Sequence, residues 1–361
     1  MYKKSILNSK KIKQLLFSAV FIMVSVLALP SLAQEKQHKA VEKFNPKAAI
    51  LEHVSDSHSW PVFGDVILPL PVILYTDKGM EVFSSANIRA EEVDGKPEKK
   101  IYQGKYYSYT AEHDNIVVVD AAGKTDEAAT KKILDFSITR NVASMWLSIA
   151  ILLIVFLSMS SAYRNRSGKA PKGVQSVLEP LVMFVRDDVA IPNIGAKYQR
   201  YIPLLLTMFF FILINNLLGL VPFFPGGFNL TGNIAVTLVL SVITLIVVNV
   251  SGNKYYWKHI FAPDIPLWLY IVMVPVEIIG IISKPFALMI RLFANMIAGH
   301  IIVLSLISLI FIFNTLWVSP ASVLFVVFMD IIELLVAFLQ AYIFTILTAL
   351  FIGMAVEEHQ H

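Results

Sequence analysis

Long apolar runs dominate the second half of the chain. A helix needs about 20 apolar residues to cross roughly 30 Å of hydrocarbon. Three runs are close to this length, at residues 142–163, 201–224 and 233–250, and two much longer runs follow at 267–313 and 320–356. The pattern predicts an all-α membrane protein with about five transmembrane helices.

The last two runs are too long to stand upright in a bilayer. As continuous helices rising about 1.5 Å per residue, they would measure roughly 70 Å and 55 Å. Only the short sequence NTLWVSP lies between them. We therefore expect a long, strongly tilted C-terminal helical hairpin that bends or lies partly along the membrane plane.

A polar region at residues 34–140 precedes these runs. The stretches DVILPLPVILYT and NIVVVDAAGK have the β-branched character of short strands bounded by Pro, Gly and Asp, and YQGKYYSYTAEHDN between them is typical of a hairpin. Residues 1–33 combine a lysine-rich start, an apolar run and the ending Ser-Leu-Ala, which predicts a signal peptide. An uncleaved membrane helix is the alternative. Both interpretations make 34–140 a small exported N-terminal segment with some β character.

Basic residues orient the remaining membrane domain, residues 141–361. The segment YRNRSGKAPKG, which follows the first span, contains Arg and Lys but no acid, so the positive-inside rule assigns it to the cytoplasm. Residues 174–190 are amphipathic and too polar to span, and we expect them to form a helix on the inner face. Five passes from an exported N-terminus then put the C-terminus in the cytoplasm.

Composition excludes several classes of function. The chain is 56% hydrophobic and 16% charged, whereas a soluble domain has about 25% charged residues. Without the five lysines of residues 1–33, the basic residues fall from 30 to 25 against 26 acidic ones, so the charge gives no support to nucleic-acid binding. There is no cysteine, which excludes thiolate chemistry and cysteine metal sites.

The exported segment offers one group of potential metal ligands. His53, Asp56 and His58 stand within six residues, but no further ligands cluster nearby, so a surface or contact segment is expected rather than a metal site. Nothing in this segment resembles a nucleophile–base pair or a phosphate-binding loop. No catalytic residue, metal site or cofactor is predicted.

Ionisable residues interrupt the first arm of the hairpin. Such groups at bilayer depth cost several kcal/mol and indicate function by default. Asn295 is one turn after Arg291, and Glu277 is close to four turns before it, so these three residues share one helix face. His300, two and a half turns after Arg291, points away. Lys284 is beside Pro285, where a break in the helix would admit water.

The second arm carries a matching set. Glu333 and Gln340 are seven residues apart and share a face, and Asp330 stands three residues before Glu333. Spaced acids, histidines and amides are typical of water-lined ion paths. The candidate residues for proton translocation are Arg291, Asn295, Gln340, Glu277, His300 and Glu333.

Three other interpretations stay open on these residues. Arg291, Asn295 and Gln340 could form a purely structural network, because buried polar groups hold membrane helices together. A secondary transporter with an exported binding module would have internal repeats and a midplane site, and no repeat is found. A membrane-anchored interaction protein would leave Arg291 unexplained.

The run SKPFALMIRLFANMIAGH resembles the signature of subunit a of the F-type ATP synthase membrane sector. LQAYIFTILTALFIGMAVEEH resembles the end of the same subunit, and NNLLGLVP is similar to another of its segments. The resemblance covers roughly residues 142–359. It implies a non-catalytic subunit of a proton-translocating ATP synthase in a bacterial inner membrane. It also implies three protein partners, namely a c-ring of small proteolipid subunits, a peripheral-stalk subunit b and the rest of the synthase, together with contact to membrane lipid.

The resemblance also implies roles for individual residues. Arg291 takes the place of the family's essential arginine, and Gln340 is expected near it. Two offset half-channels separated by Arg291 would convert proton flow into rotation of the ring. Glu277, His300 and Glu333 would line the exported-side half-channel. The choice between proton and sodium stays open.

Two positions depart from the pattern of many bacterial members. Those members carry glutamate at the position of His300 and histidine at that of Glu333, so the two residues are exchanged here, as in mitochondrial members. The exchange predicts that His300 and Glu333 face one another across the hairpin. Asn233 stands near a position where many members carry aspartate.

Overall fold

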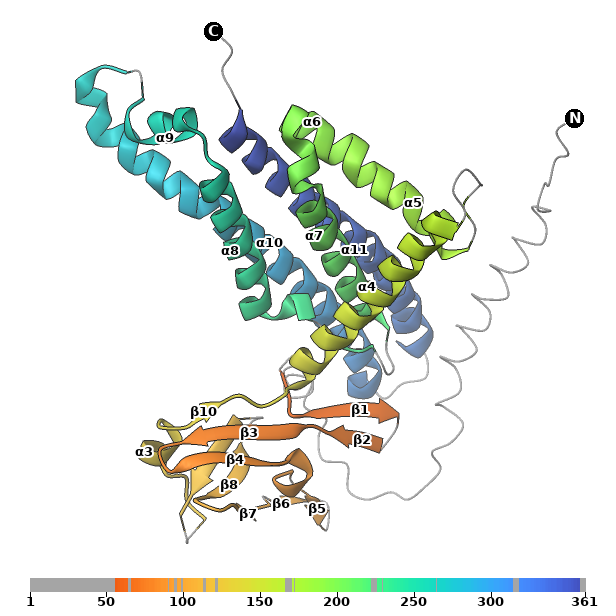
Figure 1. The fold of residues 1–361 in the computed structure, drawn as a ribbon. Coiled ribbons are helices and arrows are strands. Elements are labelled where there is room, and N and C mark those ends of the chain that lie inside the picture. Colours follow the sequence, from red (N-terminus) through yellow and green to blue (C-terminus); the bar gives the residue numbers. More distant parts are fainter. Residues whose placement is uncertain are drawn as a thin grey trace, which may run out of the picture. The chain divides into compact units, whose positions relative to one another are not determined.

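The computed structural model describes residues 56–357, except for gaps at 64–65, 90, 94–95, 99, 113–114, 121–122, 166–170, 172, 222–225, 229, 264 and 314–317. The predicted signal peptide lies outside the described residues. Figure 1 shows the helices and the strands that precede them in the chain. Five helical segments among the described residues are long and apolar enough to cross a membrane: Arg140–Arg164, Val174–Leu220, Ile234–Ser251, Trp268–Ile310 and Ser319–Val356. The predicted fold class is confirmed.

Short antiparallel strands make up most of the described residues that precede the membrane helices. They are β1 (Ser59–Phe63), β2 (Val66–Pro69), β3 (Pro71–Thr76), β4 (Gly79–Ser84), β5 (Glu91–Val93), β6 (Lys96–Glu98), β7 (Tyr102–Gln103), β8 (Ser108–Glu112), β9 (Asn115–Val119) and β10 (Leu134–Asp135), with a helical turn α3 (Glu127–Thr130). Two three-stranded sheets have the orders β10-β3-β4 and β7-β8-β9. The stretch DVILPLPVILYT contains β2 and β3, and the predicted hairpin is formed by β7, β8 and β9.

Alternation along the strands gives this segment an apolar core of its own. Val72 and Leu74 of β3 and Phe83 of β4 are buried, and they pack with Tyr109 and Val118 of the other three-stranded sheet. Their β-branched and aromatic side chains suit a pleated surface that is buried on one face.

A carboxylate is buried at the edge of this core. Glu81 is 6% exposed, and it accepts hydrogen bonds from the backbone N–H groups of Lys105 and Tyr106, at 2.8 and 2.9 Å, and from the Tyr109 hydroxyl at 2.9 Å. Burial, and then the neighbouring Glu81, raise the pKa of Tyr109. Tyr109 therefore remains a hydrogen-bond donor at physiological pH. Gly104 is required beside Glu81, because a Cβ there would overlap the carboxylate.

The membrane helices follow in chain order. They are α4 (Arg140–Asn165), α5 (Val174–Phe184), α6 (Ile191–Ile194), α7 (Tyr198–Leu220), α8 (Ile234–Ser251), α9 (Lys254–Phe261), α10 (Leu267–Phe313) and α11 (Val318–Val356). The amphipathic segment expected at 174–190 consists of α5 and a π-helical turn, Val185–Ala190. α7 ends at Leu220, four residues before the predicted boundary, because Pro222 follows and lacks a backbone N–H.

α10 and α11 are the longest of the described helices and pack against each other. They have 47 and 39 residues, or about 70 Å and 58 Å of length. α10 continues through Pro275 and Pro285, so the break considered beside Lys284 is absent. The Lys284 ammonium lies 5.5 Å from the centre of the Phe351 ring of α11, a cation–π contact that ties the two helices together.

The helices enclose one large apolar core around α7. Leu205, Phe209 and Ile212 of α7 are fully buried and belong to one cluster with Leu292 of α10 and Ile352 of α11. Lipid tails are as apolar as these side chains, so close van der Waals packing rather than the hydrophobic effect stabilises the cluster.

Residues just before β1 bind the start of α4. The backbone N–H of Asn141 donates to the Asp56 carboxylate at 3.1 Å from 85 positions away in the chain, and the N–H of Arg140 donates to the Ser57 carbonyl at 2.8 Å. The first N–H groups of a helix have no partner within the helix and need such acceptors. Asp56 therefore caps a membrane helix.

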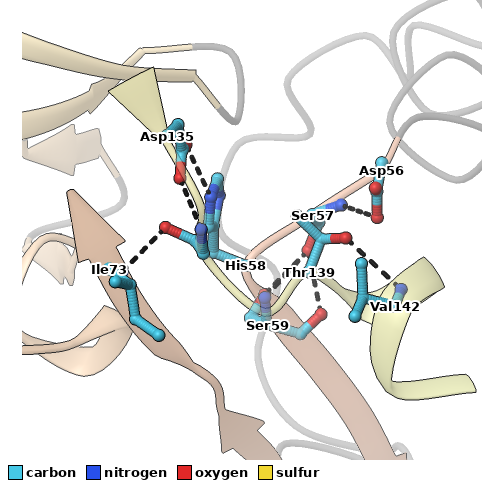
Figure 2. A network of polar contacts seen from close by, with 9 residues as sticks. Asp56, Ser57, His58, Ser59, Ile73, Asp135, Thr139 and Val142 are labelled. Carbon is cyan, nitrogen blue, oxygen red and sulfur yellow. Dashed lines mark hydrogen bonds and ion pairs between the residues drawn. The ribbon is translucent and has the colours of Figure 1, made fainter. Parts of the chain in front are cut away.

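His58 has a different partner from Asp56. Its Nε2 atom lies 3.4 Å from the Asp135 carboxylate, which also accepts from the Ser137 N–H (Figure 2). Burial raises the pKa of Asp135, but the hydrogen bonds from His58 and Ser137 outweigh burial and lower the pKa below its ordinary value. Asp56 and His58 thus serve as contact residues, as expected, and His53 lies outside the described residues.

Candidate functional site

His300 and Glu333 form a pair across the hairpin. The His300 Nδ1 atom of α10 lies 3.4 Å from the Glu333 Oε1 atom of α11, and the two side chains are 17% and 7% exposed. The predicted contact between these exchanged residues is therefore confirmed. Gly299 makes it possible, because a Cβ at that position would overlap the Glu333 carboxylate.

The far side of the His300 ring meets α7. A Cβ on Gly219 would lie 3.8 Å from His300 Nε2 and 3.0 Å from the carbonyl oxygen of Phe228. Gly219 is itself buried within α7. Because Gly219 has no side chain, both the His300 imidazole and the Phe228 carbonyl can lie close to its backbone on α7.

Asn216, three residues before Gly219, joins three parts of the membrane domain. Its side-chain amide donates to the Ala337 carbonyl of α11 at 3.2 Å, and its Oδ1 accepts from the Thr231 hydroxyl at 2.6 Å. Asn216 and Thr231 are both fully buried. Reasoning from the sequence did not select Asn216 as a site residue, although the polar pair in the apolar segment NNLLGLVP was a visible signal.

Arg291 and Asn295 lie on an exposed face of α10. Arg291 makes no hydrogen bond or ion pair with any residue that the structure describes. The structural network considered for Arg291, Asn295 and Gln340 is therefore not formed within this part of the chain. A charged residue in the middle of an apolar helix is costly and indicates function by default.

Gln340 differs from Arg291 in its surroundings. It is 4% exposed and lies one residue before the fully buried Ala341 of α11. No hydrogen bond between Gln340 and Arg291 is found among residues 56–357 outside the gaps. The expected proximity of these two side chains therefore stays a prediction.

Glu277 is not close to the His300–Glu333 pair. It precedes His300 by 23 residues on the continuous helix α10, a separation of about 35 Å. Its carboxylate lies 3.9 Å from His259 of α9. Glu277 therefore lies at a different depth of α10 from the His300–Glu333 pair, because sharing a helix face does not bring residues to the same depth.

A small cavity lies near the Glu277 end of α10. Lys284, Thr244, Tyr256 and Phe351 are among its lining residues. The Tyr256 hydroxyl donates to Asn249 at 3.2 Å, and burial, followed by the charge of Glu277, raises the pKa of this tyrosine. This end of α10 thus has polar groups that are separate from the His300–Glu333 pair.

Asn233 serves as a helix cap. Its side chain accepts a hydrogen bond from the Ala235 N–H at the start of α8, at 2.9 Å. No group of three or more metal-ligating His, Asp or Glu side chains occurs among the described residues.

Comparison with known proteins identifies the family of the membrane region. The family model described as ATP synthase A chain matches residues 142–353, which is more than half of the chain. A second model, Domain of unknown function (DUF8433), matches residues 49–136, the β segment.

Curated relatives resemble the same membrane region. ATP synthase subunit a of Chloroherpeton thalassium is 49% identical over 233 residues, covering 63% of this chain and 69% of the relative. ATP synthase subunit a 2 of Prosthecochloris aestuarii is 50% identical over 235 residues, covering 63% and 71%. ATP synthase subunit a of Myxococcus xanthus is 44% identical over 235 residues, covering 63% and 76%. The chain therefore belongs to the ATP synthase A chain family.

Proposed function

We propose that this chain is the ion-path stator of the membrane sector of a bacterial F-type ATP synthase. It conducts protons through two offset half-channels to and from the carboxylates of a c-ring and so couples the proton gradient to rotation. The chain makes and breaks no covalent bond of ATP, whose chemistry belongs to a separate soluble sector. Family membership supports a role in the proton-translocating membrane sector. The geometry of α10 and α11 supports the two half-channels and the coupling to a c-ring.

The observation that carries the proposal is the exposed Arg291. A permanent positive charge in an apolar helix is costly, and Arg291 has no anionic partner within the described residues. A ring of subunits that each carry one membrane carboxylate would supply that partner from outside. The alternative of a network that only holds the helices together would need Arg291 to be paired inside the chain.

The proposed mechanism follows from this charge. A nearby guanidinium favours the ionised form of an arriving carboxylate, so its proton leaves. The ionised carboxylate cannot move into lipid, where an isolated charge is strongly disfavoured, until it has been protonated again from the other side. The gradient supplies about 2.3 kcal/mol per charge for each 100 mV.

Polar groups on both sides of Arg291 support two separate half-channels. His300 follows Arg291 by nine residues and Glu277 precedes it by fourteen, about 14 Å and 21 Å along α10. We assign the His300–Glu333 pair to the exported-side path. We assign Glu277, which lies beside His259 of α9, to the cytoplasmic path, because the Lys254–Phe261 helix carries the basic residues expected inside.

The remaining parts of the proposal concern orientation and partners. The β segment is exported and the C-terminus is cytoplasmic, with Asn295 and Gln340 flanking the ion path near Arg291. The protein partners are the c-ring, a peripheral-stalk subunit b and the rest of the synthase, and the chain itself lies in a bacterial inner membrane. Residues 1–33 act as a signal peptide.

Arg291→Ala in the assembled complex tests the proposal. We expect ATP-driven proton pumping by inverted membrane vesicles to be lost while the complex remains assembled, because no charge then discharges the ring carboxylates. Lys284→Ala is the matched control, since Lys284 is also an exposed cation of α10 but contacts the Phe351 ring. Pumping and ATP synthesis at wild-type rates in Arg291→Ala would refute the proposal.

A further inference from the structure

Trp60 of the β segment packs against residues of the membrane domain. Trp60 of β1 is 5% exposed, and its ring meets the Phe228 ring edge-to-face, with the ring centroids 5.8 Å apart and the planes at 87°. Trp60, Phe228 and Leu230 form a buried apolar cluster. Residues of α4, α7 and α8 pack against this cluster, namely Ala143, Met145, Leu147, Phe211, Leu218 and Val236.

The segment that Trp60 contacts is held from its other side by polar groups. Leu230 begins a 3₁₀ turn, Leu230–Gly232, and the hydroxyl of Thr231 in this turn donates to the buried Asn216 of α7. Asn216 in turn donates to Ala337 of α11. Phe228 therefore packs against Trp60 of the β segment. The adjoining turn is hydrogen-bonded through Asn216 to α7 and α11.

The same segment lies next to the His300–Glu333 pair. The Phe228 carbonyl oxygen and His300 Nε2 both approach the side of Gly219 that lacks a side chain. Glu333 on α11 is the acidic group in contact with His300, and Asp330 lies one turn before it on the same helix. A shift of Phe228 would thus alter the space beside the imidazole.

We infer that the exported β segment forms part of the wall of the exported-side ion path, with Trp60 as the positioning residue that holds Phe228 beside His300. The inference rests on the proposed function, since it needs the His300–Glu333 pair to carry protons. It gives the β segment a role that the ATP synthase A chain family model, which begins at residue 142, does not cover.

Substitution of Trp60 in the complete complex tests the inference. Trp60→Leu keeps an apolar side chain but removes the ring pair. We expect it to slow passive proton conduction, measured in vesicles stripped of the soluble sector, by roughly fivefold, the factor expected from loss of one edge-to-face pair. Trp60→Phe keeps a ring and should retain most of the rate. Phe83→Leu alters another buried aromatic residue of the β core that does not contact Phe228 and should leave the rate unchanged.

A labelling experiment gives a readout that does not depend on conduction. The natural chain has no cysteine, so Leu230→Cys introduces a single thiol at a position that is 1% exposed. An impermeant maleimide added on the exported side should label it slowly when Trp60 is present and faster with Trp60→Leu. Labelling can be measured on any variant that assembles into the complex. If Trp60→Leu does not assemble, Trp60→Phe is measured instead, and it should be labelled at a rate between those of the wild type and of an unprotected thiol.

Separate outcomes distinguish the inference from the proposed function. If Glu333→Gln abolishes conduction but Trp60→Leu changes neither conduction nor labelling, the inference is wrong and the proposed function stands. If Glu333→Gln conducts protons at the wild-type rate, the assignment of the exported-side path is wrong, and the inference with it. If Phe83→Leu slows conduction as much as Trp60→Leu, the effect reflects general damage to the β segment, and the inference is refuted.

Discussion

His300 Nδ1 and Glu333 Oε1 lie 3.4 Å apart across the hairpin of α10 and α11. An imidazole can both accept and donate a proton, and a carboxylate at this distance could exchange one with it directly or through one water molecule. We therefore expect the two residues to act together in proton transfer, so that the presence of both groups matters more than which of the two helices carries each one.

The first prediction concerns exchange of the pair. His300→Ala and Glu333→Ala should each reduce ATP-driven proton pumping by about 100-fold, a typical factor for loss of a positioned proton-transfer group. The double variant His300→Glu/Glu333→His should recover most of the activity, because it restores one acid and one imidazole in contact. Fluorescence quenching in inverted vesicles measures the rate. A double variant no more active than His300→Glu alone would show that the pair is not a unit.

The second prediction uses two glycines of α10. Gly299→Ala should lower pumping, because the new methyl group overlaps the Glu333 carboxylate and displaces it from His300. Gly280→Ala is its control, since a Cβ there meets nothing within 4 Å. Alanine also favours the helix by about 1 kcal/mol over glycine. Equal activity of the two variants would contradict the importance of the close approach at Gly299.

The third prediction concerns Glu81 in the β segment. Glu81→Ala should destabilise the segment by about 3 kcal/mol, because three donors lose a charged acceptor in a buried site. The rate at which trypsin cleaves the β segment in the assembled complex measures the effect. Glu127→Ala removes an exposed carboxylate of α3 and should stay within about 0.5 kcal/mol of the wild type. Resistance of Glu81→Ala to trypsin at the wild-type level would disprove the prediction.

The fourth prediction concerns acid. The folded-state pKa of Asp135 is lowered, so its contribution to stability is present above its unfolded-state pKa, about 3.9. That contribution is lost as the pH falls through the still lower folded-state value. We expect protease resistance of the β segment to be insensitive to this group between pH 7 and about 5. Below about pH 4 resistance should fall in the wild type and less steeply in Asp135→Asn.

The sequence predicted the kind and the length of most elements, because run length and periodicity are local properties. The hairpin of α10 and α11 and the strands β2, β3, β8 and β9 are of this type. The His300–Glu333 contact was also predictable, since the exchange of the two residues relative to many family members links positions on separate helices.

Other features depend on depth or on contacts between distant residues. Glu277 shares a helix face with Arg291, but periodicity gives the angle around a helix axis and not the position of other helices along it. The approach of Phe228 and His300 at Gly219 depends on how α7 packs against α10 and α11. Trp60 and Phe228 are 168 positions apart in the chain, so no local sequence pattern predicts their contact.

The cap that Asp56 provides for α4 fixes the register of that helix. α4 has 26 residues, or about 39 Å, against roughly 30 Å of hydrocarbon, so length alone would let it slide along its axis. A slip of one residue turns a helix by about 100°, which would move the buried Ser144 and Ser148 away from the protein and the 65% exposed Trp146 toward it. Asp56 and Ser57 bind the first N–H groups of α4. The β segment therefore opposes both sliding of the first span along its axis and rotation about it.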